Sequence, residues 1–61
     1  LSERELQTLL LIASGKRLSE IAEELMLSPK TVSVYRARLL EKLKLSTNAE
    51  LAVYAIRNNL V

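Results

Sequence analysis

Positively charged side chains are concentrated in one stretch of this sequence, and they are its most promising residues for chemistry with a partner. Residues 28–44 contain five basic residues and one acid, a net charge of +4, whereas the whole chain carries +2. The basic residues are Lys30, Arg36, Arg38, Lys42 and Lys44. Ammonium and guanidinium groups bind anionic oxygens, so a one-sided cluster favours a polyanionic partner.

The composition argues against catalysis. The chain has no His, no Cys and no Asp. The commonest general base is therefore missing, a Ser-His-Asp arrangement cannot be assembled, and a metal ion would have only scattered Glu ligands. We predict that the chain is not an enzyme and holds no metal, cofactor or small-molecule ligand. The longest run of aliphatic residues has five, too short for a membrane span, and no signal-peptide pattern is present, so we expect a cytoplasmic location and no membrane partner.

One helix is expected to carry the cationic cluster. Ser28 followed by Pro29 is a strong helix start, because Ser caps free N–H groups and Pro at the first position needs none. We predict a helix over about residues 29–44. One apolar stripe at helical spacing should be buried, and it consists of Val32, Tyr35, Leu39 and Leu43.

The opposite face of this predicted helix is small at its centre and cationic at its margins. It carries Lys30, Ser33, Val34, Ala37 and Glu41, with Arg38 and Lys42 on one flank and Arg36 near the other edge. Such a surface can approach a polyanion closely, and the major groove of DNA admits one α-helix. A merely solvated helix usually carries charges of both signs, so we favour recognition of double-stranded DNA.

Three other helices are expected, and no strand alternation is visible. The first begins at a capping box of Ser2 and Glu5 and ends near Gly15. The second runs from about Leu18 to Leu25, and a three-residue turn joins it to residues 29–44, an arrangement typical of a helix-turn-helix. A Gly often occupies this turn, but here Met26 stands in its place.

The last helix begins at a second capping box, formed by Thr47 and Glu50, and should stop at Asn58-Asn59. Its expected inner stripe is Leu51, Ala52, Ala55 and Ile56, with Leu60 and Val61 packing back. Val53 and Tyr54 are left on the outer face beside Arg57, where they suggest a surface for a partner. We therefore predict one all-α domain over residues 1–61, a compact four-helix domain containing a helix-turn-helix. Because the chain begins with Leu1, we expect a C-terminal fragment of a longer protein.

Several short motifs follow one another at a regular spacing. They are Leu1-Ser2-x-Arg4-Glu5, Ala13-x-Gly15, Glu20-Ile21-Ala22, Leu27-Ser28-x-Lys30-Thr31-Val32 and Leu39-x-x-Lys42-Leu43. Together they resemble the LuxR-type helix-turn-helix, also called the NarL/FixJ output domain, over essentially the whole chain. Residues 34–38 and 50–56 are most similar to the branch attached to two-component receivers.

The resemblance implies a third helix in the major groove of paired half-sites upstream of bacterial promoters. It places groove contacts at Lys30, Ser33, Val34 and Ala37, and phosphate contacts at Thr31, Arg36, Arg38 and Lys42. It also implies a homodimer through the fourth helix, for which the candidate residues are Val53, Tyr54 and Arg57. Ser33 and Ala37 stand where relatives often have Lys, so no relative's base preference is transferred.

Two alternatives stay open. One is a helical protein-interaction module whose basic face docks an acidic partner. The other is a helix-turn-helix fragment of sigma-factor type, against which the matches along the full chain argue. The dependence of duplex binding on salt concentration tests the first alternative, because counterion release gives DNA binding a steep slope.

Overall fold

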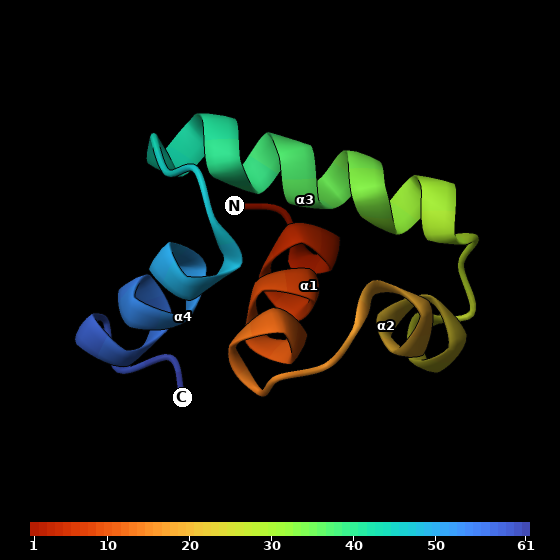
Figure 1. Ribbon diagram of the computed structural model, residues 1–61, viewed down its shortest axis with the longest axis horizontal. Helices are drawn as coiled ribbons and strands as arrows, with labels where there is room; N and C mark the ends of the chain where they lie inside the picture. Colours follow the sequence, from red (N-terminus) through yellow and green to blue (C-terminus); the bar gives the residue numbers. More distant parts are fainter.

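The computed structural model describes all 61 residues and contains four helices and no strand (Figure 1). The helices are α1 (Glu3–Ala13), α2 (Leu18–Leu25), α3 (Pro29–Leu43) and α4 (Asn48–Arg57). α1 is central and packs against the other three, while α2 and α4 lie near opposite ends of α3. The predicted all-α, four-helix fold is confirmed.

Capping boxes start α1 and α4. The Ser2 hydroxyl accepts from the Glu5 N–H at 3.3 Å, and the Ser2 N–H donates to the Glu5 carboxylate at 3.0 Å. Thr47 and Glu50 make the same reciprocal pair, at 3.2 Å and 3.0 Å. Each box satisfies N–H groups that a helix start leaves without partners. Both predicted boxes are confirmed.

The two middle helices start differently from each other. Arg17 precedes α2 and has no acceptor to offer, so only its own N–H is satisfied, by the Glu20 carboxylate at 2.8 Å. α3 has the predicted start, with Pro29 in its first turn and the Ser28 hydroxyl accepting from the Thr31 N–H at 3.2 Å. α3 is therefore fixed at its beginning by the turn that joins it to α2.

A residue in the left-handed conformation lies one or two positions after the last residue of every helix. These residues are Gly15, Met26, Lys44 and Asn59, with φ of 85°, 57°, 56° and 57°. In each case the N–H of the next residue bonds to the carbonyl five residues before it, at 2.8–3.1 Å, which closes the helix end. The predicted role of Gly15 is confirmed. The other three carry a side chain in a conformation that favours glycine, which is a local strain.

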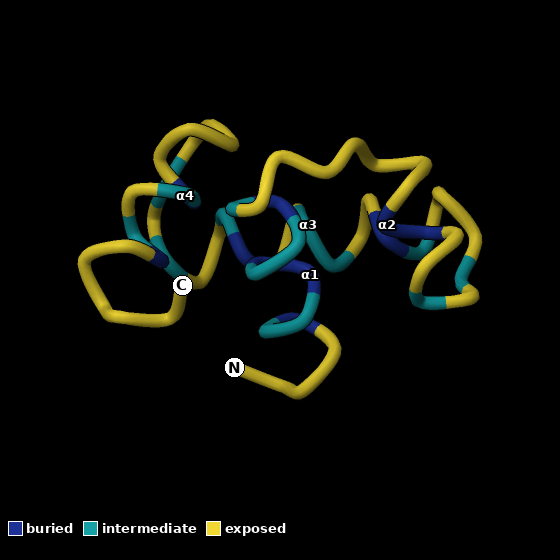
Figure 2. The backbone as a smooth tube through the Cα atoms, turned by 90° about the horizontal axis from the view of Figure 1, so that it is seen from below, coloured by how far each residue is buried: buried dark blue, intermediate teal, exposed yellow.

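The core is a single cluster of apolar side chains from all four helices. It contains Leu9, Ile12, Ile21, Ala22, Val32, Leu39, Leu51 and Ala55. Figure 2 shows that the buried segments of the helices face the middle of the molecule. In the predicted stripe of α3, Val32 and Leu39 are fully buried, whereas Tyr35 and Leu43 are half-buried. The core thus leaves the opposite side of α3 uncovered.

The predicted faces of α4 are partly wrong. Leu51 and Ala55 are buried as predicted, but Tyr54 packs against the core instead of facing outward. At about 100° per residue, Tyr54 lies roughly 80° from the centre of the Leu51–Ala55 stripe, whereas Ile56 lies roughly 120° away. The apolar residues predicted inside but found exposed are Ile56 at 62%, Leu60 at 37% and Val61 at 60%.

Candidate nucleic-acid interface

α2, the turn after it and α3 form a helix-turn-helix. Figure 1 shows α2 nearly end-on while α3 lies across the view, so the two helices cross steeply. The Leu27 N–H bonds to the Ala22 carbonyl at 2.8 Å and closes the turn, while Met26 points outward with 91% of its surface exposed. The small, buried Ala22 lets the helices approach closely. This crossing leaves α3 on the outside of the molecule.

The outer face of α3 is open along its length. The four predicted base-contacting residues, Lys30, Ser33, Val34 and Ala37, are all exposed. Lys30 and Arg38 take part in no side-chain hydrogen bond or ion pair, so their charges are available to a partner. The Thr31 hydroxyl is hydrogen-bonded to that of Ser28 at 2.9 Å, next to the positive start of the helix.

Two of the predicted phosphate-binding cations are already paired with residues of other helices. Lys42 Nζ lies 2.8 Å from the Glu5 carboxylate, and Arg36 Nε donates to Asn48 Oδ1 at 2.6 Å. These are the only two hydrogen bonds between side chains of different helices. They tie α3 to α1 and to α4. The pairs join residues 37 and 12 positions apart in the chain, so no local pattern could have revealed them.

Glu5 is the buried end of one of these ties. Its side chain is 3% exposed and accepts hydrogen bonds from Lys42 and from the Ser2 N–H. The hydrogen bond from Lys42, followed by that from Ser2, lowers the pKa of Glu5 from 4.5 to about 2, although burial acts in the opposite direction. Glu5 is therefore ionised at neutral pH and holds the Lys42 ammonium. The sequence assigned Glu5 only to a capping box, which is half of its role.

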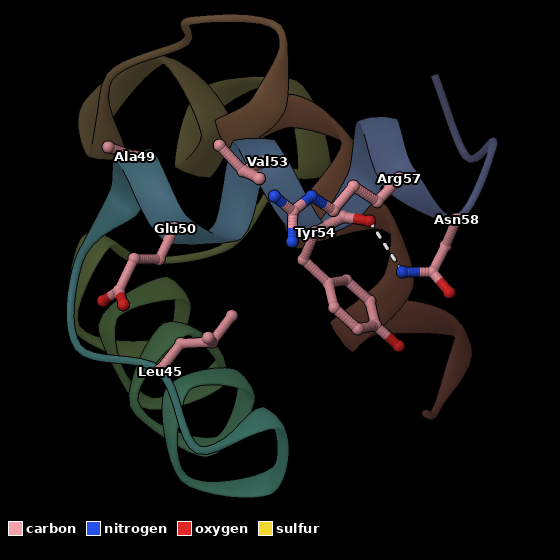
Figure 3. A pocket seen from close by; sticks show the side chains of 7 residues that line it. All are labelled: Leu45, Ala49, Glu50, Val53, Tyr54, Arg57 and Asn58. Atoms are coloured by element: carbon pink, nitrogen blue, oxygen red, sulfur yellow. Dashed lines mark hydrogen bonds between the residues drawn. The ribbon is translucent and has the colours of Figure 1, made fainter.

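A second surface lies on α4. Residues of α4 and of its two flanking segments line a hollow of about 360 Å³, namely Leu45, Ala49, Glu50, Val53, Tyr54, Arg57 and Asn58 (Figure 3). In this view the Arg57 guanidinium lies between Val53 and Tyr54. The structure therefore brings together the three residues predicted for dimerisation. Val53 is 45% exposed, while Tyr54 is half-buried at the edge of the core.

Two other kinds of site are not found in the structure. No three side chains of His, Cys, Asp or Glu come close enough together to hold a metal ion. None of the four helices combines the length and the apolar character that crossing a bilayer requires. The surfaces that stand out are thus the cationic face of α3 and the hollow on α4.

The steep crossing of α2 and α3, together with an open cationic α3, defines a helix-turn-helix domain. A family model described as bacterial regulatory proteins, luxR family, matches residues 1–55. The chain belongs to this family, which comprises DNA-binding regulators of transcription and not enzymes. The resemblance seen in the sequence is confirmed.

Individual relatives are response regulators. The chain is 48% identical over 61 residues to response regulator GacA of Pseudomonas aeruginosa and 52% identical over 60 residues to response regulator UvrY of Escherichia coli. It is 46% identical over 61 residues to GacA of Pseudomonas protegens. These matches cover 98–100% of this chain but only 28–29% of each relative. The chain thus spans less than a third of the length of these relatives.

Proposed function

We propose that this chain is the DNA-binding output domain of a two-component response regulator and acts by placing α3 in the major groove of double-stranded DNA. The observation that carries the proposal is the outer face of α3, which is exposed, small at its centre and cationic, and which no other element covers. The response regulators that match the whole chain support the same role. The domain binds and does not catalyse, and it works in the bacterial cytoplasm on nucleoid DNA.

In this proposal, different residues of α3 position the domain and read the sequence. Val34 and Ala37 meet thymine methyl groups, while Lys30 and Ser33 bond to base edges. Phosphates are held by Thr31, Arg36, Arg38 and the positive start of the helix. Lys42, paired with Glu5, contributes mainly by fixing the angle of α3.

We further propose that two copies pair through α4 when they bind adjacent half-sites. One small domain covers a modest surface on DNA and should hold one half-site weakly. A second copy alongside gains from high effective concentration without new base contacts. The exposed Val53 and the hollow beside it, with Tyr54 and Arg57, supply the apolar surface for this contact.

The test is a titration of the domain with duplexes selected from a random pool and with random duplex, at several salt concentrations. With three to four phosphates contacted, the log–log slope should be about −3 to −4. Polyaspartate of similar length is the control. A module that docks acidic proteins would bind polyaspartate as well as DNA and would enrich no sequence from the pool, and either result would overturn the proposal. The match to the luxR family leaves the sigma-factor alternative without support.

A further inference from the structure

A second hollow, which is lined by two cations, lies beside α3. It has a volume of about 220 Å³ and is bordered by the α1–α2 turn, α3 and the first turn of α4. Its polar residues are Lys16, Ser33, Arg36 and Asn48, and its apolar residues are Ile12, Leu18 and Ile21. Two cations, a hydroxyl and an amide line it without any acid, which is the chemistry of an anion site. We call this hollow the Lys16–Arg36 notch.

A single hydrogen bond, from Nε, holds the Arg36 guanidinium in the notch. Its Nε donates to Asn48 Oδ1 at 2.6 Å, and the side chain makes no other hydrogen bond. A guanidinium has five N–H donors in a rigid fork, so the four on the terminal nitrogens remain available. Arg36 is also half-buried. A fixed fork with free terminal donors suits a phosphate oxygen pair, which guanidinium binds in two-pronged fashion.

The notch opens at the edge of the face that we propose to read DNA. Ser33 lines the notch and also belongs to the exposed face of α3. At about 100° per residue, Arg36 and Ser33 lie on one flank of that face, whereas Thr31 and Arg38 lie on the other. A sugar–phosphate backbone borders the major groove on each side. A helix in the groove therefore needs phosphate contacts on both flanks, and the notch supplies those on the second.

We infer that the Lys16–Arg36 notch binds one backbone phosphate of the DNA strand opposite to that held by Arg38. Lys16 and Arg36 contact the phosphate, and Asn48 is a positioning residue that orients the guanidinium. This inference rests on the proposed DNA binding and adds Lys16 and Asn48 to the residues assigned from the sequence. Because Asn48 is the first residue of α4, the same hydrogen bond would transmit phosphate binding to the helix proposed for dimerisation.

The first experiment compares two neighbouring cations. Lys16→Ala should weaken binding to selected and random duplexes alike, by about five- to tenfold near 0.1 M salt, as expected for one phosphate contact. Arg17→Ala is the matched control, because it removes the same charge one residue away, from a side chain that does not line the notch. Equal losses of affinity in the two variants would mean that only the net charge of the domain matters. That result would overturn the inference that the notch binds a phosphate.

The second experiment isolates Asn48. Asn48→Ala should lower affinity severalfold in the parent and have no effect in an Arg36→Ala background, since its role is to orient Arg36. A loss of equal size in both backgrounds would overturn the positioning role. Thermal unfolding of each variant shows whether folding itself has changed, and it should shift little, because the bond lies on the exposed surface.

A third measurement identifies the phosphate. Duplexes carrying a single uncharged methylphosphonate, scanned along each strand, should bind the parent less well at one position where Lys16→Ala adds no further loss. No such position would overturn the inference. If the parent shows no salt-dependent duplex binding at all, the proposed function itself fails. If the parent binds and Lys16→Ala behaves as the parent does, only the notch fails.

Discussion

α3 and α4 each bury one apolar stripe and expose the opposite face, but the two exposed faces differ in chemistry. α3 exposes Lys30 and Val34 with a free cation, Arg38, on its flank. α4 exposes Val53 and Ile56 at 45% and 62%. A small cationic face suits a polyanion, whereas an apolar face is favourable only against another apolar surface. The same architecture thus exposes one helix face that suits a polyanion and one that suits an apolar protein surface.

The two helices also differ in how they are attached. α3 packs on α1 and α2 and is tied at two points, by Lys42 to Glu5 and by Arg36 to Asn48. α4 packs mainly on α1 and shares only the second of these ties. Base readout needs side chains held in a fixed geometry by their surroundings. The more firmly held helix is therefore the one to which we assign base readout.

The largest effect on DNA binding is expected when one negative charge is placed on either of the two exposed faces. Val34→Glu puts a carboxylate at the centre of the α3 face, where repulsion from phosphates should lower single half-site affinity by at least about a hundredfold. Val53→Glu puts the same charge on α4. It should leave single half-site affinity nearly unchanged and abolish cooperative filling of two adjacent half-sites. Anisotropy titrations on one-site and two-site duplexes measure both.

The same two variants can also contradict the roles that we assign to α3 and α4. If Val53→Glu fills two half-sites as cooperatively as the parent, α4 is not the dimer surface. If Val34→Glu binds as the parent does, α3 is not the helix in the groove. Circular dichroism should show unchanged helix content in both variants, because each side chain points away from the core.

An effect on DNA affinity about ten times smaller than that of Val34→Glu should distinguish the role of Arg38 from that of Lys42. Arg38→Ala should make the log–log salt slope shallower by about 0.9, the value for one phosphate, and leave the melting temperature unchanged. Lys42→Ala removes the cation from buried Glu5 and should instead lower the melting temperature with little change in slope. If Lys42→Ala instead keeps the stability of the parent and has a shallower slope, Lys42 binds a phosphate, as predicted from the sequence.

The features that depend on residues close together in the chain could be predicted from the sequence. The Ser2 and Thr47 capping boxes, the Ser28–Pro29 start and the exposed face of α3 follow from residues within a few turns of one another. The ties to Glu5 and Asn48 depend on tertiary packing and were not visible. The faces of α4 were misjudged because apolar residues surround much of that helix, so that periodicity alone could not choose between Tyr54 and Ile56. The assignment of base and phosphate contacts stays a prediction.

A change of about 1 kcal/mol in the free energy of unfolding is expected from a substitution in the turn before α3. Met26 adopts φ of 57°, which costs a residue with a side chain roughly 1 kcal/mol relative to glycine. Met26→Gly should therefore raise the free energy of unfolding by about that amount, measured by urea denaturation, without altering DNA affinity. Asn59→Gly, at the end of α4, is the matched control with the same φ, and it should gain less because Asn tolerates this conformation. Equal gains would show that the turn before α3 is under no special strain.

The smallest expected difference is the one between the two capping glutamates, which are both ionised at neutral pH and which a fall in pH distinguishes. Hydrogen bonds from Lys42 and Ser2 lower the pKa of Glu5 to about 2, and N–H donors from Ser46 and Thr47 lower that of Glu50, which forms no ion pair. A carboxylate whose pKa is depressed by folding stabilises the fold fully above its unfolded value near 4.5, and this stabilisation is lost as pH falls toward the folded value. Thermal melts should therefore show the parent losing stability between about pH 5 and pH 2. Glu5→Gln should remove most of that dependence, and Glu50→Gln, which leaves the tie between α1 and α3 intact, should remove less. If the two variants flatten the profile equally, Lys42 does not hold Glu5 in solution, and its charge would join that of Arg38 on the flank that faces DNA.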